Sequence, residues 1–393
     1  MGLPLAYCVC EGHFHLGLRL YMKKLGVIVN PIAGLGGKVG LKGSDGVEVQ
    51  RKARELGSQP ESPRRAVEAL KVVSKIKHCI KVIAYPHEMG EEECREAGFS
   101  PIVIGSAQSG GTTAEDTENA ARQMLAQGVD LLLFAGGDGT ARNVCHAVGD
   151  KVPALGIPAG VKIHSAVFAI TPRSAGEVVA LFLQGRLMNI REAEVMDTDE
   201  DAFRRGTVSA RLYGYLRVPE ESRYVQSVKS GGTSAEKEAL QGIAADVIDS
   251  MDDVNSYYII GPGTTTRALM DALGLKDTLL GVDVVRDKQI VANDVTENEL
   301  ISLIEGHCAK IIVTVIGGQG LVFGRGNQQL SPRVIRRVGK ENIIVIATKA
   351  KLASLSGRPL LLDTGDEDLN AELSGYSRVT TGYKDHIMYK VGY

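Results

Sequence analysis

Short, almost uninterrupted apolar runs alternate with stretches of helical periodicity in the first half of the chain. The runs lie at residues 81–84, 102–104, 131–135 and 154–157. A short apolar run bounded by turn residues predicts a strand that is covered on both faces of a parallel sheet. Helical patterns lie between most of the runs, and residues 63–78 carry a clear apolar stripe. This alternation predicts a Rossmann-like, doubly wound α/β domain.

The pattern changes near residue 187, where longer runs alternate between apolar and polar residues, most clearly at 208–218. Such alternation predicts antiparallel strands with one wet face. We therefore expect an N-terminal extension, an α/β domain, a β-rich second domain, and a tail that packs back on the first domain. Their bounds are residues 1–21, 22–186, 187–340 and 341–393.

Local signals add detail to this plan. Thr112 with Glu115, and Ser174 with Glu177, have the spacing of capping boxes ahead of helical segments. Residues 38–60 are polar and rich in glycine, which predicts a long loop near a site.

Composition narrows the class of protein. The chain has 393 residues, of which 44% are hydrophobic and 23% charged, with a formal net charge of −2. It can bury a large core, and its charge gives no reason to expect nucleic acid or an anionic membrane as a partner. The six cysteines lack the spacing of a disulfide scaffold or zinc ribbon. We expect a cytoplasmic protein. Residues 1–21 are interpreted as a disordered extension or a misassigned start. A metal site on the Cys and His residues of this segment is the less favoured alternative.

One motif carries most of the chemical information, namely Gly136-Gly137-Asp138-Gly139-Thr140. It follows the apolar run at 131–135 and precedes a helical pattern. A strand that enters a helix through a glycine-rich turn directs backbone N–H groups and the positive end of the helix dipole at one point, which favours phosphate. A carboxylate repels phosphate, so Asp138 is the candidate for chemistry. The alternative is a tight turn in which Asp138 only caps the helix.

These residues resemble a known family. Gly-Gly-Asp-Gly-Thr after an apolar strand is similar to the signature shared by NAD kinases and by diacylglycerol and sphingoid-base kinases. Two more segments, at residues 25–34 with Asn30-Pro31 and at 257–268 with Gly263-Thr264-Thr265-Thr266, resemble the ATP-NAD kinase family. The resemblance is greatest to its longer branch, which includes the acetoin-catabolism X proteins.

The resemblance implies a kinase that transfers a phosphoryl group from ATP to the 2′-hydroxyl of NAD and produces NADP. Asp138 would orient this hydroxyl or accept its proton. Backbone amides of Gly136, Gly137 and Gly139, with the Thr140 hydroxyl, would hold phosphate. Gly263, Thr264, Thr265 and Thr266 would form a second phosphate cradle opposite the first. Mg²⁺ would accompany ATP without a dedicated protein cage, and a homo-oligomer is implied by the resemblance alone.

Four further residues are candidates for nucleotide or phosphate binding. Asn30 ends the first strand, Arg142 and Asn143 lie in the first helical turn after the signature, and Lys162 follows another strand end. Ligands collect at the carboxyl ends of such strands, which favours a role for Lys162. A turn-forming Asn30 and a solvated Arg142 are equally good readings. His164 is interpreted as a packed or hydrogen-bonded histidine.

The chain departs from typical NAD kinases at several points. Ala141-Arg142 replaces two bulky aliphatic residues, and a convincing pair of Asn with an acidic residue for the adenine and ribose is missing. Two alternatives therefore stay open: a kinase of another hydroxyl, on a lipid or small metabolite, and a non-catalytic nucleotide-binding regulator. The choice of ATP or polyphosphate, and of NAD or NADH, is also open. Residues 317–326 are interpreted as a loop that bounds the site.

Overall fold

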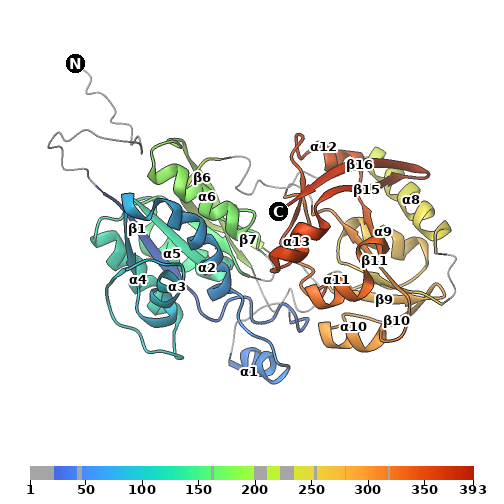
Figure 1. Cartoon of the computed structure of the whole chain (residues 1–393), viewed down its shortest axis with the longest axis horizontal. Helices are drawn as coiled ribbons and strands as arrows, with labels where there is room; N and C mark the ends of the chain where they lie inside the picture. The colour runs from blue at the N-terminus through green and yellow to red at the C-terminus, as the bar shows by residue number, and fades with distance from the viewer. Residues whose placement is uncertain are drawn as a thin grey trace, which may run out of the picture.

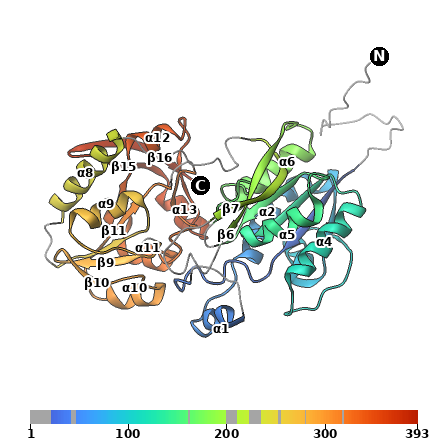
Figure 2. The same ribbon diagram turned by 180° about the vertical axis from the view of Figure 1, so that it is seen from behind.

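The computed structural model describes residues 22–41, 47–160, 163–198, 210–221, 234–251, 255–278, 280–316 and 319–393. They fold into two lobes that lie side by side, each built on its own sheet (Figure 1). The helix α1 (Val47–Glu55) lies below the junction of the lobes in both views (Figure 2).

The first lobe contains a parallel sheet that has five strands in the described part of the chain, in the order β3-β2-β1-β4-β5. The strands are β1 (Lys23–Val29), β2 (Ile80–Ala84), β3 (Ile102–Val103), β4 (Leu131–Gly136) and β5 (Ala154–Pro158). Every residue of β4 is buried, as its apolar sequence predicts. The direction of winding reverses between β1 and β4. In such sheets ligands bind outside the carboxyl ends of the strands at this switch point.

Helices cover both faces of this sheet. Helix α2 packs against α6, and α4 packs against α5. The helical segments are α2 (Ser62–Val73), η1 (Ser74–Cys79), η2 (His87–Met89), α3 (Glu91–Glu96), α4 (Ala114–Ala126), α5 (Asp138–Val148) and α6 (Pro172–Leu183). The predicted doubly wound domain is confirmed. The helix predicted at 63–78 tightens into a 3₁₀ segment after Val73.

Three local predictions need correction. In α4 the capping box is made by Thr113 and Asp116, one residue after the predicted Thr112 pair. In α6 the cap is Thr171, because the following proline fits the first helical position, and Ser174 lies inside the first turn. The predicted loop at 38–60 contains α1, whose buried Ala53 packs with Leu35 and Val39.

The second lobe contains a mixed sheet that has nine strands among the described residues, in the order β10-β9-β8-β11-β13-β15-β16-β14-β12. Parallel pairing in its centre joins β8, β11, β13 and β15. The strands are β8 (Tyr257–Ile260), β9 (Asp283–Arg286), β10 (Gln289–Ala292), β11 (Ala309–Thr314), β12 (Leu321–Phe323), β13 (Ile343–Ile346), β14 (Leu360–Leu362), β15 (Gly375–Gly382) and β16 (Asp385–Gly392). The prediction of a β-rich second domain is confirmed.

This sheet has a hydrophobic core on each face. In β8, Tyr258 and Ile260 pack toward α8 and α9, whereas Tyr257 and Ile259 face the core that contains α10, α11 and α13. The helical segments are α8 (Ser234–Asp249), α9 (Thr264–Ala272), α10 (Glu297–Leu303), α11 (Pro332–Val338), η3 (Lys340–Asn342), α12 (Lys349–Ala353) and α13 (Glu367–Leu373). Successive strand residues point to opposite faces, so an apolar strand of this kind is buried on both.

Two strands stand apart from both sheets. β6 (Ile190–Thr198) and β7 (Ala210–Pro219) pair as the predicted antiparallel ribbon. Their buried residues, among them Val195 and Leu216, belong to the core of the first lobe, and both strands contact α5. The strand-rich lobe therefore starts after the ribbon, later than the predicted residue 187.

The tail was expected to pack back on the first domain. Instead, its strands β13 to β16 pair within the second sheet, where β13 is the parallel neighbour of β11 and β14 is the parallel neighbour of β12. The chain end still touches the first lobe, where the Arg173 guanidinium lies 5.8 Å from the ring centre of Tyr393. Of the helices in the described ranges, none is both long and apolar enough to cross a bilayer.

Candidate functional site

The glycine-rich turn joins β4 to α5 at the switch point of the parallel sheet. Gly137 occupies the N-cap position with extended backbone, and Asp138 is the first residue of the helix. The reading of Asp138 as the helix cap is therefore wrong. A Cβ on Gly136 would lie 2.3 Å from Thr140 Oγ1, so this position must be glycine for the threonine to pack beneath it.

The Asp138 carboxylate is held by backbone amides of the segment that follows β5. His164 N donates to Oδ2 at 2.8 Å, and Ser165 N donates to Oδ1 at 3.0 Å. The residue is only 8% exposed. Each carboxylate oxygen has a second lone pair, so both amide bonds can persist while the carboxylate accepts another proton donor. No sequence pattern predicts these donors, since any residue except proline can supply a backbone amide.

Two glycines let the turns after β4 and β5 approach each other. A Cβ on Gly137 would lie 3.3 Å from Gly160 Cα. The amides of Ala159 and Gly160 donate to the Gly136 carbonyl at 2.9 and 3.1 Å. Lys162 lies outside the described residues, so its predicted role stays a prediction. His164 is exposed rather than packed, and its backbone amide is what touches Asp138.

Asn30 links the end of β1 to the same turn. Its Nδ2 donates to Thr140 Oγ1 at 2.9 Å, and its Oδ1 accepts from Ile32 N at 3.3 Å. Its backbone amide also donates to the Ala135 carbonyl at 3.0 Å. The side chain thus joins the two strand ends on either side of the switch point. Both readings of Asn30, a turn former and a site residue, are compatible with this position.

The other predicted residues of the first lobe lie on the first turns of α5. Gly139, Arg142 and Asn143 are half-buried, and Thr140 is buried. Helix geometry leaves the amides of Gly139 and Thr140 without intrahelical acceptors, as required for phosphate binding. Their roles toward phosphate stay predictions.

The threonine turn forms a second group, at the start of α9. Gly263 caps the helix with φ of 146°, a conformation that favours glycine. Thr266 Oγ1 donates to the Gly263 carbonyl at 2.9 Å. Lys351 of α12 donates from Nζ to Thr265 Oγ1 at 2.8 Å and to Thr264 Oγ1 at 3.3 Å. Sequence reasoning missed Lys351, because the tail was not expected to reach this turn.

A fourth hydroxyl, that of Thr314, lies beneath the same turn. Thr314 ends β11, the strand next to β8, and a Cβ on Gly263 would meet its Cγ2 at 2.3 Å. Thr314 is 5% exposed, and its Oγ1 has no hydrogen-bond partner within the described part of the chain. Hydroxyls, an ammonium group and helical amides therefore converge at the N-terminus of α9. This combination of donors suits an anion.

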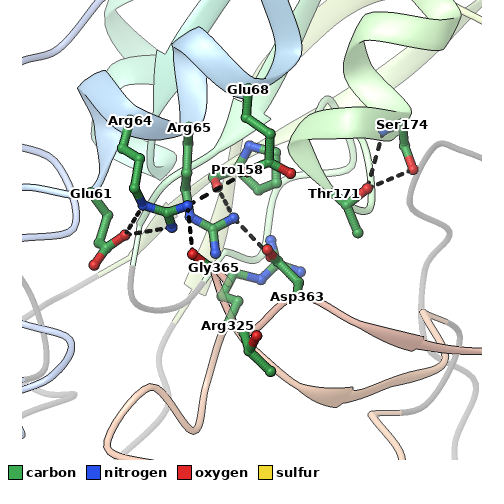
Figure 3. Close-up of polar contacts among 12 residues, drawn as sticks. Glu61, Arg64, Arg65, Glu68, Pro158, Thr171, Ser174, Arg325, Asp363 and Gly365 are labelled. Atoms are coloured by element: carbon green, nitrogen blue, oxygen red, sulfur yellow. Dashed lines mark hydrogen bonds and ion pairs between the residues drawn. The ribbon is translucent and has the colours of Figure 1, made fainter. Parts of the chain in front are cut away.

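A buried ion pair joins the two lobes beside the first site. Arg65 of α2 lies 2.8 Å from Asp363 Oδ2, and both side chains are almost fully buried. The same Nη1 donates to the Pro158 carbonyl, at the end of β5, at 2.9 Å. Figure 3 shows this contact beside that of Arg64 with Glu61 and the Gly365 carbonyl.

Positive charge at this junction lowers the pKa of Glu61. Burial alone would raise its pKa, but Arg64 and then Lys38 outweigh it and lower the pKa of Glu61 to about 2. Lys38 lies 3.1 Å from Glu61 Oε1. Lys38 also contacts the second lobe, since its carbonyl accepts from Glu297 N at 3.2 Å. The junction is thus held by charged groups from both lobes.

Arg325, after β12, also reaches the junction and was missed by sequence reasoning, which treated residues 317–326 as a bounding loop. The side chain lies with Arg65 and Asp363 (Figure 3) and interacts electrostatically with Asp138. It is 5% exposed. Residues 317 and 318 lie outside the described residues.

Within the ranges that the structure describes, no group of three or more His, Cys, Asp or Glu side chains could hold a metal ion. The donors at the two turns are amides, hydroxyls and an ammonium group, and this set suits phosphate.

Comparison with protein families agrees with this architecture. The ATP-NAD kinase N-terminal domain matches residues 25–187, and the ATP-NAD kinase C-terminal domain matches residues 253–391. A search of curated proteins found no match. The matched segments contain the glycine-rich turn and the threonine turn respectively, and the two domains support NAD kinase activity, which produces NADP. The chain belongs to the ATP-NAD kinase family.

Proposed function

We propose that Asp138 orients the 2′-hydroxyl of the NAD adenosine ribose and accepts its proton while the hydroxyl oxygen attacks the γ-phosphorus of ATP. The new bond joins O2′ to phosphorus, and the bond between phosphorus and the β,γ-bridging oxygen breaks to release ADP. The observation that carries this proposal is the pair of amide hydrogen bonds, at 2.8 and 3.0 Å, that fixes both Asp138 oxygens at the switch point. A fixed carboxylate is what alignment of a hydroxyl requires.

Phosphate binding is assigned to the surrounding donors. The amides of Gly139 and Thr140 at the start of α5 would hold one phosphate, with Asn30 fixing Thr140. The threonine turn would hold a second, with Lys351 neutralising its charge. Mg²⁺ bound to the phosphates would offset their remaining charge.

The finer properties rest on the family resemblance. We assign the chain to the longer branch that includes the acetoin-catabolism X proteins, and we expect a cytoplasmic homo-oligomer. Size-exclusion chromatography with light scattering would test the oligomer.

The experiment uses the full chain and Asp138→Asn. Each is incubated with magnesium and either ATP or polyphosphate, and with NAD, NADH or diacylglycerol as acceptor. We expect NADP from NAD, and a loss of about 10² to 10⁴ in rate for the variant, the usual worth of a general base. NAD binding by Asp138→Asn, measured by calorimetry, serves as the control for folding.

Two outcomes would contradict the proposal. Product from diacylglycerol but not from either dinucleotide would show a lipid kinase. Full activity of Asp138→Asn would remove the role of the carboxylate and leave only the phosphate-binding turns.

A further inference from the structure

Arg325 is a buried positive charge beside the proposed site, 5% exposed, and it has no role in the proposed phosphoryl transfer. It follows β12 in the second lobe, yet its guanidinium lies at the junction with the first lobe (Figure 3). Its charge interacts with those of Arg65, Asp138 and Asp363. An arginine of the second lobe therefore lies at the junction of the lobes and interacts electrostatically with the Asp138 carboxylate of the first.

The hydrogen bonds of Arg325 are incomplete. Its Nη2 donates to Gln319 Oε1, but its buried Nη1 has no partner among the described residues. A buried charged donor without an acceptor is unfavourable, and native structures rarely retain one without a functional reason. Burial is also the main reason that the pKa of Arg325 falls to about 10, and the neighbouring Arg65 lowers it further.

The nearby carboxylates already have partners of their own. Asp363 forms the ion pair with Arg65, and Asp138 accepts from two backbone amides. Two guanidinium groups thus share one junction with two carboxylates that are held elsewhere. An added anion would give Arg325 Nη1 an acceptor and would reduce the repulsion between the two arginines.

We propose that Arg325 binds the phosphoryl group that is transferred beside Asp138, so that the second lobe supplies a phosphate-binding residue of the active site. This inference rests on the proposed function for the identity of the phosphate. A guanidinium suits it, because its fork of donors matches two phosphate oxygens and its charge offsets the charge of the transition state. Since Nη1 is covered by protein, binding of the phosphate requires a local opening of the junction, of the kind by which enzyme domains admit and enclose substrates.

The test compares Arg325→Met with the full wild-type chain and with Arg64→Met. Arg64 is the matched control, since it also bridges the lobes, through the Gly365 carbonyl, but is half-exposed. The first readout is the kcat for NADP formation. We expect Arg325→Met to lower kcat by about 10² to 10³, the usual effect of removing one charge-stabilising donor, and Arg64→Met to change it less than threefold.

The second readout needs no turnover. Tripolyphosphate, added at rising concentration, should raise the melting temperature of the wild type and of Arg64→Met more than that of Arg325→Met, in which only the α5 amides and the threonine turn still hold phosphate. If Arg325→Met does not fold, Arg325→Gln replaces it, because glutamine can still hydrogen-bond to Gln319 but carries no charge. An equal shift in the Arg325 variant and the wild type, or no shift in any protein, would overturn the inference.

The two readouts separate the inference from the proposed function. A wild type that makes no NADP from ATP or polyphosphate would refute the proposed function, while the tripolyphosphate shift would still decide whether Arg325 binds phosphate. A wild type that makes NADP at the same kcat as Arg325→Met would refute the inference and leave the proposed function standing.

Discussion

Asn30 Nδ2 donates a hydrogen bond to Thr140 Oγ1 at 2.9 Å, across the switch point of the parallel sheet. The bond ties the end of β1 to the first turn of α5, and thereby to the helix that begins with Asp138. The amide of Asn30 acts on the turn that carries the carboxylate, so its effect on catalysis is one of positioning.

Asn30→Ala should therefore lower NADP formation by about ten- to a hundredfold, because a small displacement of a reacting group has effects of this size. The loss of one hydrogen bond should also lower the free energy of unfolding by about 1 kcal/mol. Steady-state kinetics and urea unfolding would measure both effects.

Thr140→Val provides the partner for a double-mutant cycle. If the two side chains act through their shared bond, the double variant will be no worse than the poorer single variant. Additive losses in kcat would show that Asn30 acts elsewhere.

The second prediction concerns the glycine-rich turn. Gly136→Ala would place a Cβ 2.3 Å from Thr140 Oγ1. Such overpacking typically lowers the free energy of unfolding by about 1 to 3 kcal/mol. Activity should fall as well, since Thr140 must move.

Gly111→Ala is the matched control, because the nearest atom to its added Cβ is 3.6 Å away and the residue is exposed. Urea unfolding should show little change for it. Equal stability of Gly136→Ala and the wild type would mean that the turn adjusts freely, contrary to the packing described here.

The third prediction concerns Lys351. Lys351→Met removes the ammonium group that donates to Thr264 and Thr265. If the threonine turn holds phosphate, KM for ATP should rise about tenfold, which corresponds to about 1.4 kcal/mol. The free energy of unfolding should stay the same or rise slightly. A cation at a helix N-terminus interacts unfavourably with the helix dipole, at a cost of about 0.3 to 1 kcal/mol.

Lys349→Met is the control on the same helix, where the lysine is exposed and lies 2.6 Å from Asp385. The KM of Lys349→Met for ATP should equal that of the wild type. Equal KM values for both variants would place the bound phosphate away from Lys351.

Much of the first lobe could be predicted because its signals are local. The apolar run at 131–135, the glycines that follow it and the helical spacing after Asp138 each depend on neighbours in sequence. The turn type, the strand before it and the helix after it follow from a few residues.

The rest depends on which distant segments meet. The donors to Asp138 are backbone amides that follow another strand, and Lys351 and Arg325 come from segments with no motif of their own. The tail was misplaced because short apolar strands fit either sheet, and strand pairing alone decided between them. Side-chain identity carries little information on such pairings.

The last prediction concerns Glu93 and the stability of the fold alone. It lies in α3 at 4% exposure, and its Oε2 has no hydrogen-bond partner in the described part of the chain. Burial raises its pKa from 4.5 to about 7. The folded protein therefore keeps this proton over a pH range in which the unfolded chain has lost it. The stability linked to Glu93 is fully present below pH 4.5 and is lost as pH rises through about 7.

Glu93→Gln removes this dependence, because an amide stays neutral at every pH. At pH 8 the variant should be more stable than the wild type by up to about 3 kcal/mol, since one pKa unit corresponds to about 1.4 kcal/mol. At about pH 4.5, where both side chains are neutral, the difference should be small. Urea unfolding across this range would measure it, with the exposed Glu96→Gln on the same helix as control. A constant difference between Glu93→Gln and the wild type at all pH values would show that Glu93 is ionised in the folded protein, and that water or a nearby cation reaches its carboxylate.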